Sequence, residues 1–295
     1  MTTRAIPARS APSRMPWRDR QGAFSPFKAT VLLALLLPAL WLGWQAANGL
    51  LGGRPLTEAI HQTGLWGVRI LLVSLLISPL RQLLRQPRVM LVRRMVGVAA
   101  MAYILAHFVL YTADLGFDLA KLVSEIVLRF YLTIGFVALA GLVALGITST
   151  DGWVKRMGGR RWQALHRAVY AIAILGLVHF VLQTKLDVTE AMLTSGLFLW
   201  LMLYRLVGPK GAAPPLWQLA LLVPAAALGT ALLEAAWYGL FTGIPALPVL
   251  QANLDVEFGL RPARWVGIVA AGMVAVALLG RWWQQRRPAR RRAAA

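Results

Sequence analysis

Three of the four histidines in this sequence, His107, His166 and His179, lie within or at the start of long apolar stretches. An imidazole is costly to bury in hydrocarbon unless its nitrogens find a partner. Its neutral form also carries a lone pair that binds metals, haem iron among them. These residues therefore predict either hydrogen bonds to neighbouring helices or a haem centre inside a membrane. His61 lies in polar sequence, and we expect it to be an ordinary loop residue.

The spacing of the histidines predicts two levels across a membrane. His166 and His179 are about 13 residues apart, which is about 20 Å of helix rise. In parallel helices His107 falls at the depth of His179, so these two could bind one iron from opposite sides. His166 marks a second level that has no histidine opposite it. In an ideal helix His166 and His179 also point about 140° apart, so either the two cofactors are offset or the helix is distorted.

The composition is that of a helical membrane protein. Of the 295 residues, 58% are hydrophobic and 14% are charged, against about 25% charged in an ordinary soluble domain. The apolar runs are continuous and about 20 residues long, as in spanning helices, whereas strands of a membrane barrel alternate apolar and polar residues. The chain has no cysteine, which excludes disulfides, cysteine-ligated iron–sulfur clusters and covalent haem attachment.

The net charge of +20 would suggest nucleic acid in a soluble protein. Here the basic residues lie between apolar runs, where the positive-inside rule places them. We therefore expect a lipid bilayer as the surrounding medium and no nucleic acid as a partner.

We predict an all-α bundle of about eight transmembrane helices. The expected spans are residues 27–50, 64–80, 90–113, 130–147, 162–182, 188–207, 216–241 and 265–280. Residues 1–26 are predicted to form a disordered basic cytoplasmic tail, residues 27–207 a six-helix domain, residues 208–280 an added two-helix segment, and residues 281–295 a second basic cytoplasmic tail.

The distribution of charge predicts the orientation of these spans. With both termini in the cytoplasm, the inner side carries 24 of the 31 lysines and arginines and only two of the 11 acidic residues. This asymmetry follows the positive-inside rule and favours an even number of spans.

Several motifs around the histidines resemble the MsrQ (YedZ) family of the ferric-reductase-like transmembrane superfamily. The resemblance covers about residues 63–207, and the stretch around His166 is its most specific part. It is carried by Arg93-Arg94-Met95-Val96-Gly97 ahead of His107, by Gly146-Ile147-Thr148-Ser149, and by Arg161-Trp162-Gln163-Ala164-Leu165-His166-Arg167-Ala168-Val169-Tyr170 ahead of His179. One departure is Phe130, which stands where the family usually has proline.

The resemblance implies a haem-binding membrane subunit that transfers electrons. It implies haem b and FMN as cofactors, and electrons drawn from the quinone pool or from a cytosolic flavin reductase. The electrons would pass to MsrP, a periplasmic molybdopterin subunit that reduces methionine sulfoxide in proteins, across the bacterial inner membrane. The family's haem-related histidines correspond to His107 and His179, as ligands of an outer haem, and to His166 at an inner site.

Five arginines near the two levels are candidate partners for haem propionates or a flavin phosphate, because guanidinium pairs with such anions. Arg69 and Arg129 lie on the predicted outer side. Arg93, Arg94 and Arg167 lie on the inner side, where they also fit ordinary positive-inside anchoring.

The sequence lacks a dinucleotide-binding domain. No Gly-x-Gly-x-x-Gly follows a predicted strand, and no soluble stretch is long enough for such a domain. The electron donor must therefore be another molecule, and substrate chemistry is expected on the partner. Two alternatives stay open: another quinol-linked cytochrome b, and a solute transporter. The outer connection, residues 242–262, is a candidate contact for the periplasmic partner.

Overall fold

The computed structural model describes residues 15–19, 21–184, 187–209 and 211–286. Most of both predicted tails, residues 1–14 and 287–295, lies outside this range. Within the described residues, eight helical stretches are long and apolar enough to cross a membrane, which confirms the predicted fold class. They are Pro26–Ala47, Pro55–Leu84, Pro87–Asp114, Phe130–Ile147, Gly159–Thr184, Thr189–Val207, Leu216–Thr242 and Pro262–Gln285.

The chain divides into two compact units at Pro55. In the first unit, helix α1 (Pro26–Ala47) begins with proline in its first turn, where the missing N–H is no loss. A short turn precedes α1, in the stretch predicted to be a disordered tail. There the Asp19 carboxylate accepts hydrogen bonds from the backbone N–H groups of Gln21 and Ala23.

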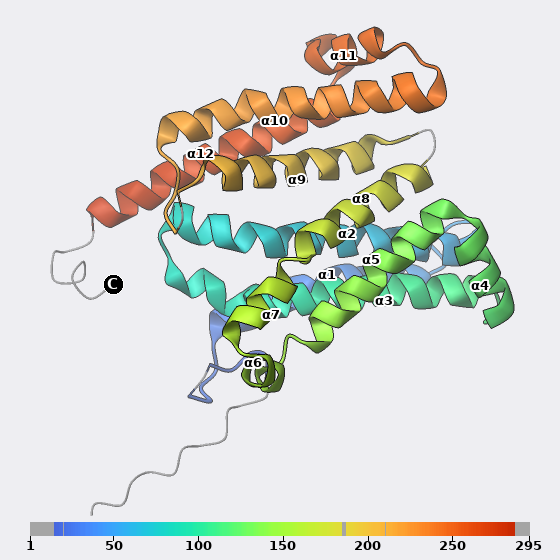
Figure 1. Cartoon of the computed structure of the whole chain (residues 1–295), viewed down its shortest axis with the longest axis horizontal. Coiled ribbons are helices and arrows are strands. Elements are labelled where there is room, and N and C mark those ends of the chain that lie inside the picture. The colour runs from blue at the N-terminus through green and yellow to red at the C-terminus, as the bar shows by residue number, and fades with distance from the viewer. Residues whose placement is uncertain (1–14, 20, 185–186, 210, 287–295) are drawn as a thin grey trace, which may run out of the picture. The chain divides into compact units, whose positions relative to one another are not determined.

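The second unit holds the other seven spans, together with shorter helices at their ends (Figure 1). Its elements are α2 (Pro55–Leu84), η1 (Pro87–Val92), α3 (Arg93–Asp114), α4 (Leu119–Leu128), α5 (Phe130–Ile147), α6 (Asp151–Met157), α7 (Gly159–His166), α8 (Val169–Thr184), α9 (Thr189–Val207), α10 (Leu216–Trp237), η2 (Tyr238–Thr242), α11 (Ala246–Leu254), η3 (Val256–Phe258) and α12 (Pro262–Gln285). We call the end of this bundle that carries α6 and α7 the basic end, and the end that carries α4 the opposite end.

Helix α2 begins nine residues before the predicted start of its span, and this corrects the expectation for His61. Pro55 opens the helix and Glu58 lies in its first turn, two features that suit a helix N-terminus. His61 is therefore an exposed helical residue and not part of a loop.

The helical stretch that carries His166 and His179 is distorted between them. Helix α7 ends at His166 and α8 begins at Val169, with a turn at Arg167 and Ala168. Of the two possibilities left open by the 140° offset, the distorted helix is the one the structure contains.

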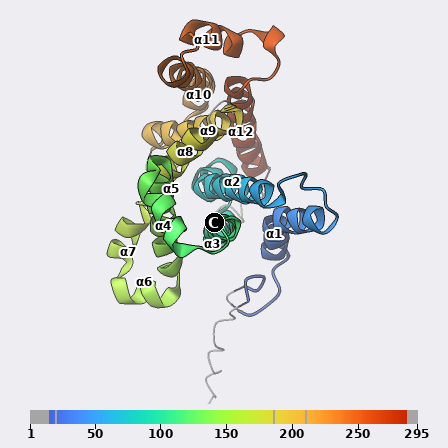
Figure 2. The ribbon, with the colours of Figure 1, turned by 90° about the vertical axis from the view of Figure 1, so that its right-hand side faces the viewer.

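Helices α9, α10 and α12 pack closely through small side chains. A Cβ atom added to Gly196 on α9 would overlap the side chains of Thr230 on α10 and Val266 on α12. Such small residues let helix backbones approach in a membrane, where association depends on close packing. Both views of the bundle place α9 on one side of α10 and α11 on the other (Figures 1 and 2).

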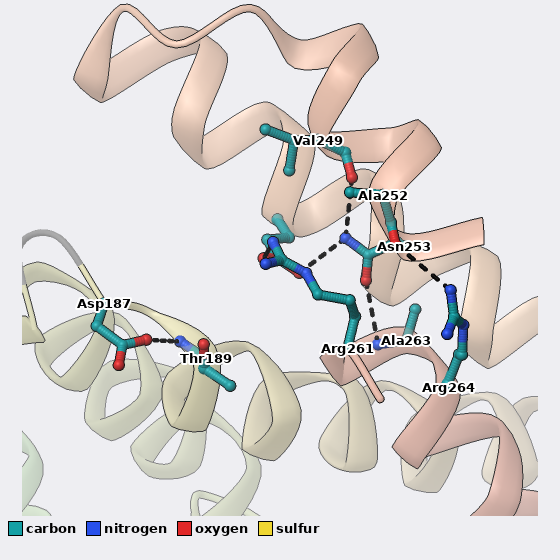
Figure 3. A network of polar contacts seen from close by, with 9 residues as sticks. Asp187, Thr189, Val249, Ala252, Asn253, Arg261, Ala263 and Arg264 are labelled. Carbon is teal, nitrogen blue, oxygen red and sulfur yellow. Dashed lines mark hydrogen bonds and ion pairs between the residues drawn. The ribbon is translucent and has the colours of Figure 1, made fainter. Parts of the chain in front are cut away.

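A buried polar network joins α10 to the segment before α12 (Figure 3). Glu234 on α10 is 1% exposed, and its carboxylate accepts hydrogen bonds from Asn253 Nδ2 at 2.9 Å and from Arg261 at 2.6 Å. Asn253 Oδ1 accepts from the N–H of Ala263, the second residue of α12. The network therefore fixes three elements to one another.

Replacing Arg261 by methionine is expected to destabilise the C-terminal helices by about 3 kcal/mol, because it leaves the Glu234 carboxylate buried without its cation. This loss of stability is at the low end of the range for breaking a buried ion pair, because the Arg261 side chain is 33% exposed. Thermal unfolding of the purified protein in detergent measures the change. Arg286→Met, at an exposed position, is the control. Equal stability of the two variants would contradict a structural role for the ion pair.

Candidate metal centre

His107 projects from α3 towards α2, where its ring is held at one nitrogen. Nδ1 lies 2.8 Å from the backbone carbonyl oxygen of Ile60. A carbonyl only accepts, so Nδ1 carries the proton, and Nε2 has its lone pair free. Gly64 leaves room for the ring, because a Cβ at that position would come within 2.9 Å of Nδ1.

His179 on α8 repeats this arrangement against α5. Its Nδ1 donates to the backbone carbonyl oxygen of Tyr131 at 2.8 Å. A Cβ on Gly135 would come within 2.7 Å of Nδ1. In both cases the neighbouring helix supplies a carbonyl and, four residues later, a glycine. The repetition indicates that the two rings are held for the same purpose.

The two histidines lie on α3 and α8, helices that both pack against α5. Helices α3 and α5 meet at this level, where the rings of Phe108 and Phe136 have centroids 6.0 Å apart. Two neutral imidazoles with Nε2 free are the ligand set of a haem iron, whose other four ligands come from the porphyrin. That His107 and His179 ligate one iron stays a prediction, which the chemistry of their free nitrogens supports.

The described residues contain no cluster of three or more His, Asp or Glu side chains that could hold a metal ion. Haem iron needs only one or two protein ligands.

His166 is held differently. Its Nε2 lies 3.2 Å from the Thr148 hydroxyl, and that hydroxyl is 2.8 Å from the carbonyl oxygen of Ala144. The hydroxyl proton therefore goes to Ala144, and Nε2 donates to the Thr148 oxygen. Trp162 stacks on the His166 ring with centroids 4.0 Å apart and donates its indole N–H to the Thr148 carbonyl. His166 thus presents Nδ1, not Nε2, as its free nitrogen.

Replacing Thr148 by valine is expected to cost about 1 kcal/mol of stability, the usual net value of such a hydrogen bond. It also leaves the His166 ring without its partner. Thermal unfolding in detergent measures the change. Ser149→Ala is the matched control, because the Ser149 hydroxyl bonds only to Leu145 of its own helix. A Thr148→Val variant as stable as the control would show that the His166 bond contributes nothing.

His166 lines a cavity of about 470 Å³ at the basic end, between α2, α3, α5 and the α7–α8 turn. Cofactor pockets usually measure about 300–1,000 Å³. Three of the five predicted arginines, Arg93, Arg94 and Arg167, line the same cavity. Arg94 is also paired with Asp151 at 2.5 Å. The cavity is therefore large enough for part of a cofactor and is positively charged.

The two arginines predicted near the outer level already have carboxylate partners. Arg69 pairs with Glu190 at 2.7 Å, and Arg129 pairs with Glu125 at 2.7 Å. A hydrogen bond to Tyr131 raises the pKa of the Arg129 guanidinium further. The structure thus places Arg129 beside the residue whose carbonyl holds His179.

Arg205 on α9 was not singled out from the sequence. Its guanidinium donates to the carbonyl oxygen of Leu75 on α2 at 2.7 Å and to the Tyr170 hydroxyl on α8 at 3.2 Å. Leu75 and Tyr170 both line the cavity. Arg205 therefore fixes two walls of the cavity to α9, a role that only the three-dimensional contacts reveal.

Comparison with known proteins places these features in a family. The family model "Ferric reductase like transmembrane component" matches residues 63–177. A Caulobacter vibrioides protein named "Protein-methionine-sulfoxide reductase heme-binding subunit MsrQ" is 41% identical over 176 residues, which are 59% of this chain and 84% of that protein. The chain belongs to the MsrQ family.

Other members of the MsrQ family support this assignment. The MsrQ protein of Rhodospirillum rubrum is 40% identical over 191 residues, 64% of this chain and 89% of that protein. The MsrQ protein of Xanthomonas axonopodis pv. citri is 41% identical over 174 residues, 59% of this chain and 79% of that protein. No solved structure matches the chain significantly.

Proposed function

We propose that this chain binds haem b between His107 and His179 and carries electrons across the bacterial inner membrane to a methionine-sulfoxide reductase catalytic subunit. The observation that carries the proposal is the repeated bond from histidine Nδ1 to a carbonyl on the neighbouring helix. The relatives in the MsrQ family are named as heme-binding subunits of that reductase.

The chain's own residues prepare the site before any cofactor binds. The backbone carbonyls of Ile60 and Tyr131 fix the tautomer and the rotation of the two rings, as carbonyls that accept from metal-binding histidines do. Gly64 and Gly135 provide the space for those rings. Haem bound there supplies an iron that takes up and releases one electron. Substrate chemistry stays with the partner.

The cavity around His166 is the proposed second cofactor site. Arg93, Arg94 and Arg167 would hold anionic groups there, either haem propionates or the phosphate of FMN. Arg69 and Arg129 have the same proposed role near the histidine pair. The electron donor is the quinone pool or a cytosolic flavin reductase.

The proposed acceptor is MsrP, a molybdopterin subunit in the periplasm that repairs oxidised methionine in proteins. The arginine-rich end of the bundle carries α6 and α7, and the positive-inside rule places that end in the cytoplasm. With an even number of spans, both termini would then lie in the cytoplasm. The His107–His179 pair would lie nearer the periplasm.

The first test is the visible spectrum of the purified protein, with a reducible Soret band and α-band of haem b as the expected result. A folded, colourless protein after expression with ample haem would contradict the proposal. The second test is reduction of purified MsrP by quinol in vesicles that contain this chain. Haem that is reduced by quinol but never passes electrons to MsrP would favour another quinol-linked cytochrome b.

A further inference from the structure

The segment between η2 and α12 contains the short helix α11, and the sequence analysis named this connection as a candidate contact for the periplasmic partner. We propose instead that α11 and the turn after it form a lipid-facing interfacial helix, seated at the headgroup boundary of the leaflet at the opposite end. The proposal is independent of the haem chemistry, and it rests on depth, on the outward face and on hydrogen bonds within the protein.

Depth is the first argument. Glu234 lies about 18 residues beyond Leu216, the first residue of α10, which is about 27 Å of helix rise. The hydrocarbon core of a bilayer is about 30 Å thick. Asn253, near the C-terminal end of α11, binds the Glu234 carboxylate, so this end of α11 lies at the edge of the hydrocarbon layer. Figures 1 and 2 agree that α11 lies beside α10 rather than beyond its end.

The outward face of α11 is the second argument. Leu247 and Leu254 are 63% and 62% exposed, while Asn253 on the other face is 1% exposed. Phe258 and Leu260, in the turn that follows, are also exposed. A helix facing water presents polar residues outward, whereas an interfacial helix presents leucine and phenylalanine to the acyl chains. The exposed face of α11 presents Leu247 and Leu254 with the polar Gln251 between them, a mixture that suits the headgroup boundary.

Other exposed apolar residues lie close to this segment in the sequence. Leu240 and Phe241, at the end of the α10 span, are large, exposed and apolar. A hollow of about 540 Å³ on the α11 face is lined by six residues, of which Asp255 alone is charged: Pro248, Gln251, Ala252, Leu254, Asp255 and Phe258. A hollow with this lining suits an acyl chain better than a charged protein surface.

Hydrogen bonds within the protein satisfy much of the irregular backbone of this segment, which is the third argument. Irregular backbone at membrane depth is tolerated where protein supplies its hydrogen bonds. Asn253 donates to the carbonyl oxygen of Val249 and accepts from Ala263 N–H, and Arg264 donates to the carbonyl oxygen of Ala252 (Figure 3). The charged side chains of Asp255 and Glu257, which follow α11, stay exposed, as the headgroup boundary allows.

The absence of cysteine from the chain allows a direct test. Single-cysteine variants Leu247→Cys and Leu254→Cys would carry a nitroxide label in the full-length protein, reconstituted into vesicles of phosphatidylethanolamine and phosphatidylglycerol. Leu232→Cys, on the exposed face of the α10 span, is the lipid reference, and Glu257→Cys, at an exposed charged position, is the water reference. Electron paramagnetic resonance then measures access of oxygen and of a water-soluble nickel complex to each label.

We expect the labels at 247 and 254 to resemble the lipid reference. Oxygen access should be high, and nickel access about tenfold lower than at position 257, because polar complexes are excluded from hydrocarbon. Nickel access equal to that at position 257 would overturn the proposal by placing α11 in water. Low access of both reagents would overturn it too, by showing that protein covers the face. Monodisperse purification of each variant confirms folding.

Discussion

Replacing either His107 or His179 by alanine is expected to abolish the haem bound between them. Each substitution removes one of the two proposed Nε2 ligands and leaves the other ring as the single remaining histidine ligand of the pair. The low-spin spectrum that two imidazoles produce should disappear in both variants, with haem content lowered by one equivalent per chain. Pyridine haemochrome assays and reduced-minus-oxidised spectra of the purified variants measure these losses.

Two other histidines provide the controls. His61→Ala changes an exposed residue of α2, so haem content should match that of the wild-type protein. His166→Ala should affect only the cavity at the basic end and leave the spectrum of the His107–His179 pair in place. If either His107→Ala or His179→Ala kept its full haem content and spectrum, the proposed pairing of ligands would be wrong.

Replacing Gly64 or Gly135 by alanine is expected to weaken haem binding by about 10- to 100-fold, the usual cost of disturbing the support of a metal ligand. The new Cβ would lie 2.9 Å from Nδ1 of His107 or 2.7 Å from Nδ1 of His179. The imidazole must move, and its bond to the carbonyl is lost. Alanine otherwise favours a helix by about 1 kcal/mol over glycine, so helix stability cannot explain the loss.

Haem titration of the apoprotein in detergent measures the affinity of each glycine variant. Gly272→Ala on α12 is the matched control, since a Cβ there meets no atom within 4 Å. The control should bind haem like the wild-type protein and unfold at the same temperature or slightly higher. Equal affinity of the Gly64→Ala, Gly135→Ala and control variants would show that the rings do not need their observed positions.

The spans and the histidine pair could be predicted because both follow from local sequence. Continuous apolar runs predict membrane helices, and residues 130–147 match the structure at both ends. The shared depth of His107 and His179 was predicted because their two spans cross the membrane in the same direction. The sequence did not reveal their carbonyl partners, because every residue has a carbonyl and only the packing of helices selects Ile60 and Tyr131.

The start of α2, the break after His166 and the positions of the arginines could not be read from apolar runs alone. The early start of α2 has a local signal in Pro55 and Glu58. These two residues precede the apolar run from which the span was predicted. The break after His166 carried no such signal, since Arg167 and Ala168 are both good helix formers. It coincides with the hydrogen bond from His166 to Thr148 and the stacking of Trp162. Of the arginines, Arg93, Arg94 and Arg167 gather at the cavity, whereas Arg69 and Arg129 lie in ion pairs.

The carbonyl groups of Ile60 and Tyr131 have a thermodynamic consequence for the proposed haem. An imidazole that donates its Nδ1 proton to a carbonyl becomes a stronger base at Nε2. A more basic histidine ligand would stabilise ferric iron relative to ferrous iron and lower the reduction potential. Because both rings are held in this way, a haem bound by His107 and His179 would be biased towards releasing an electron rather than storing it. Such a bias is what a relay needs at the last centre before its partner.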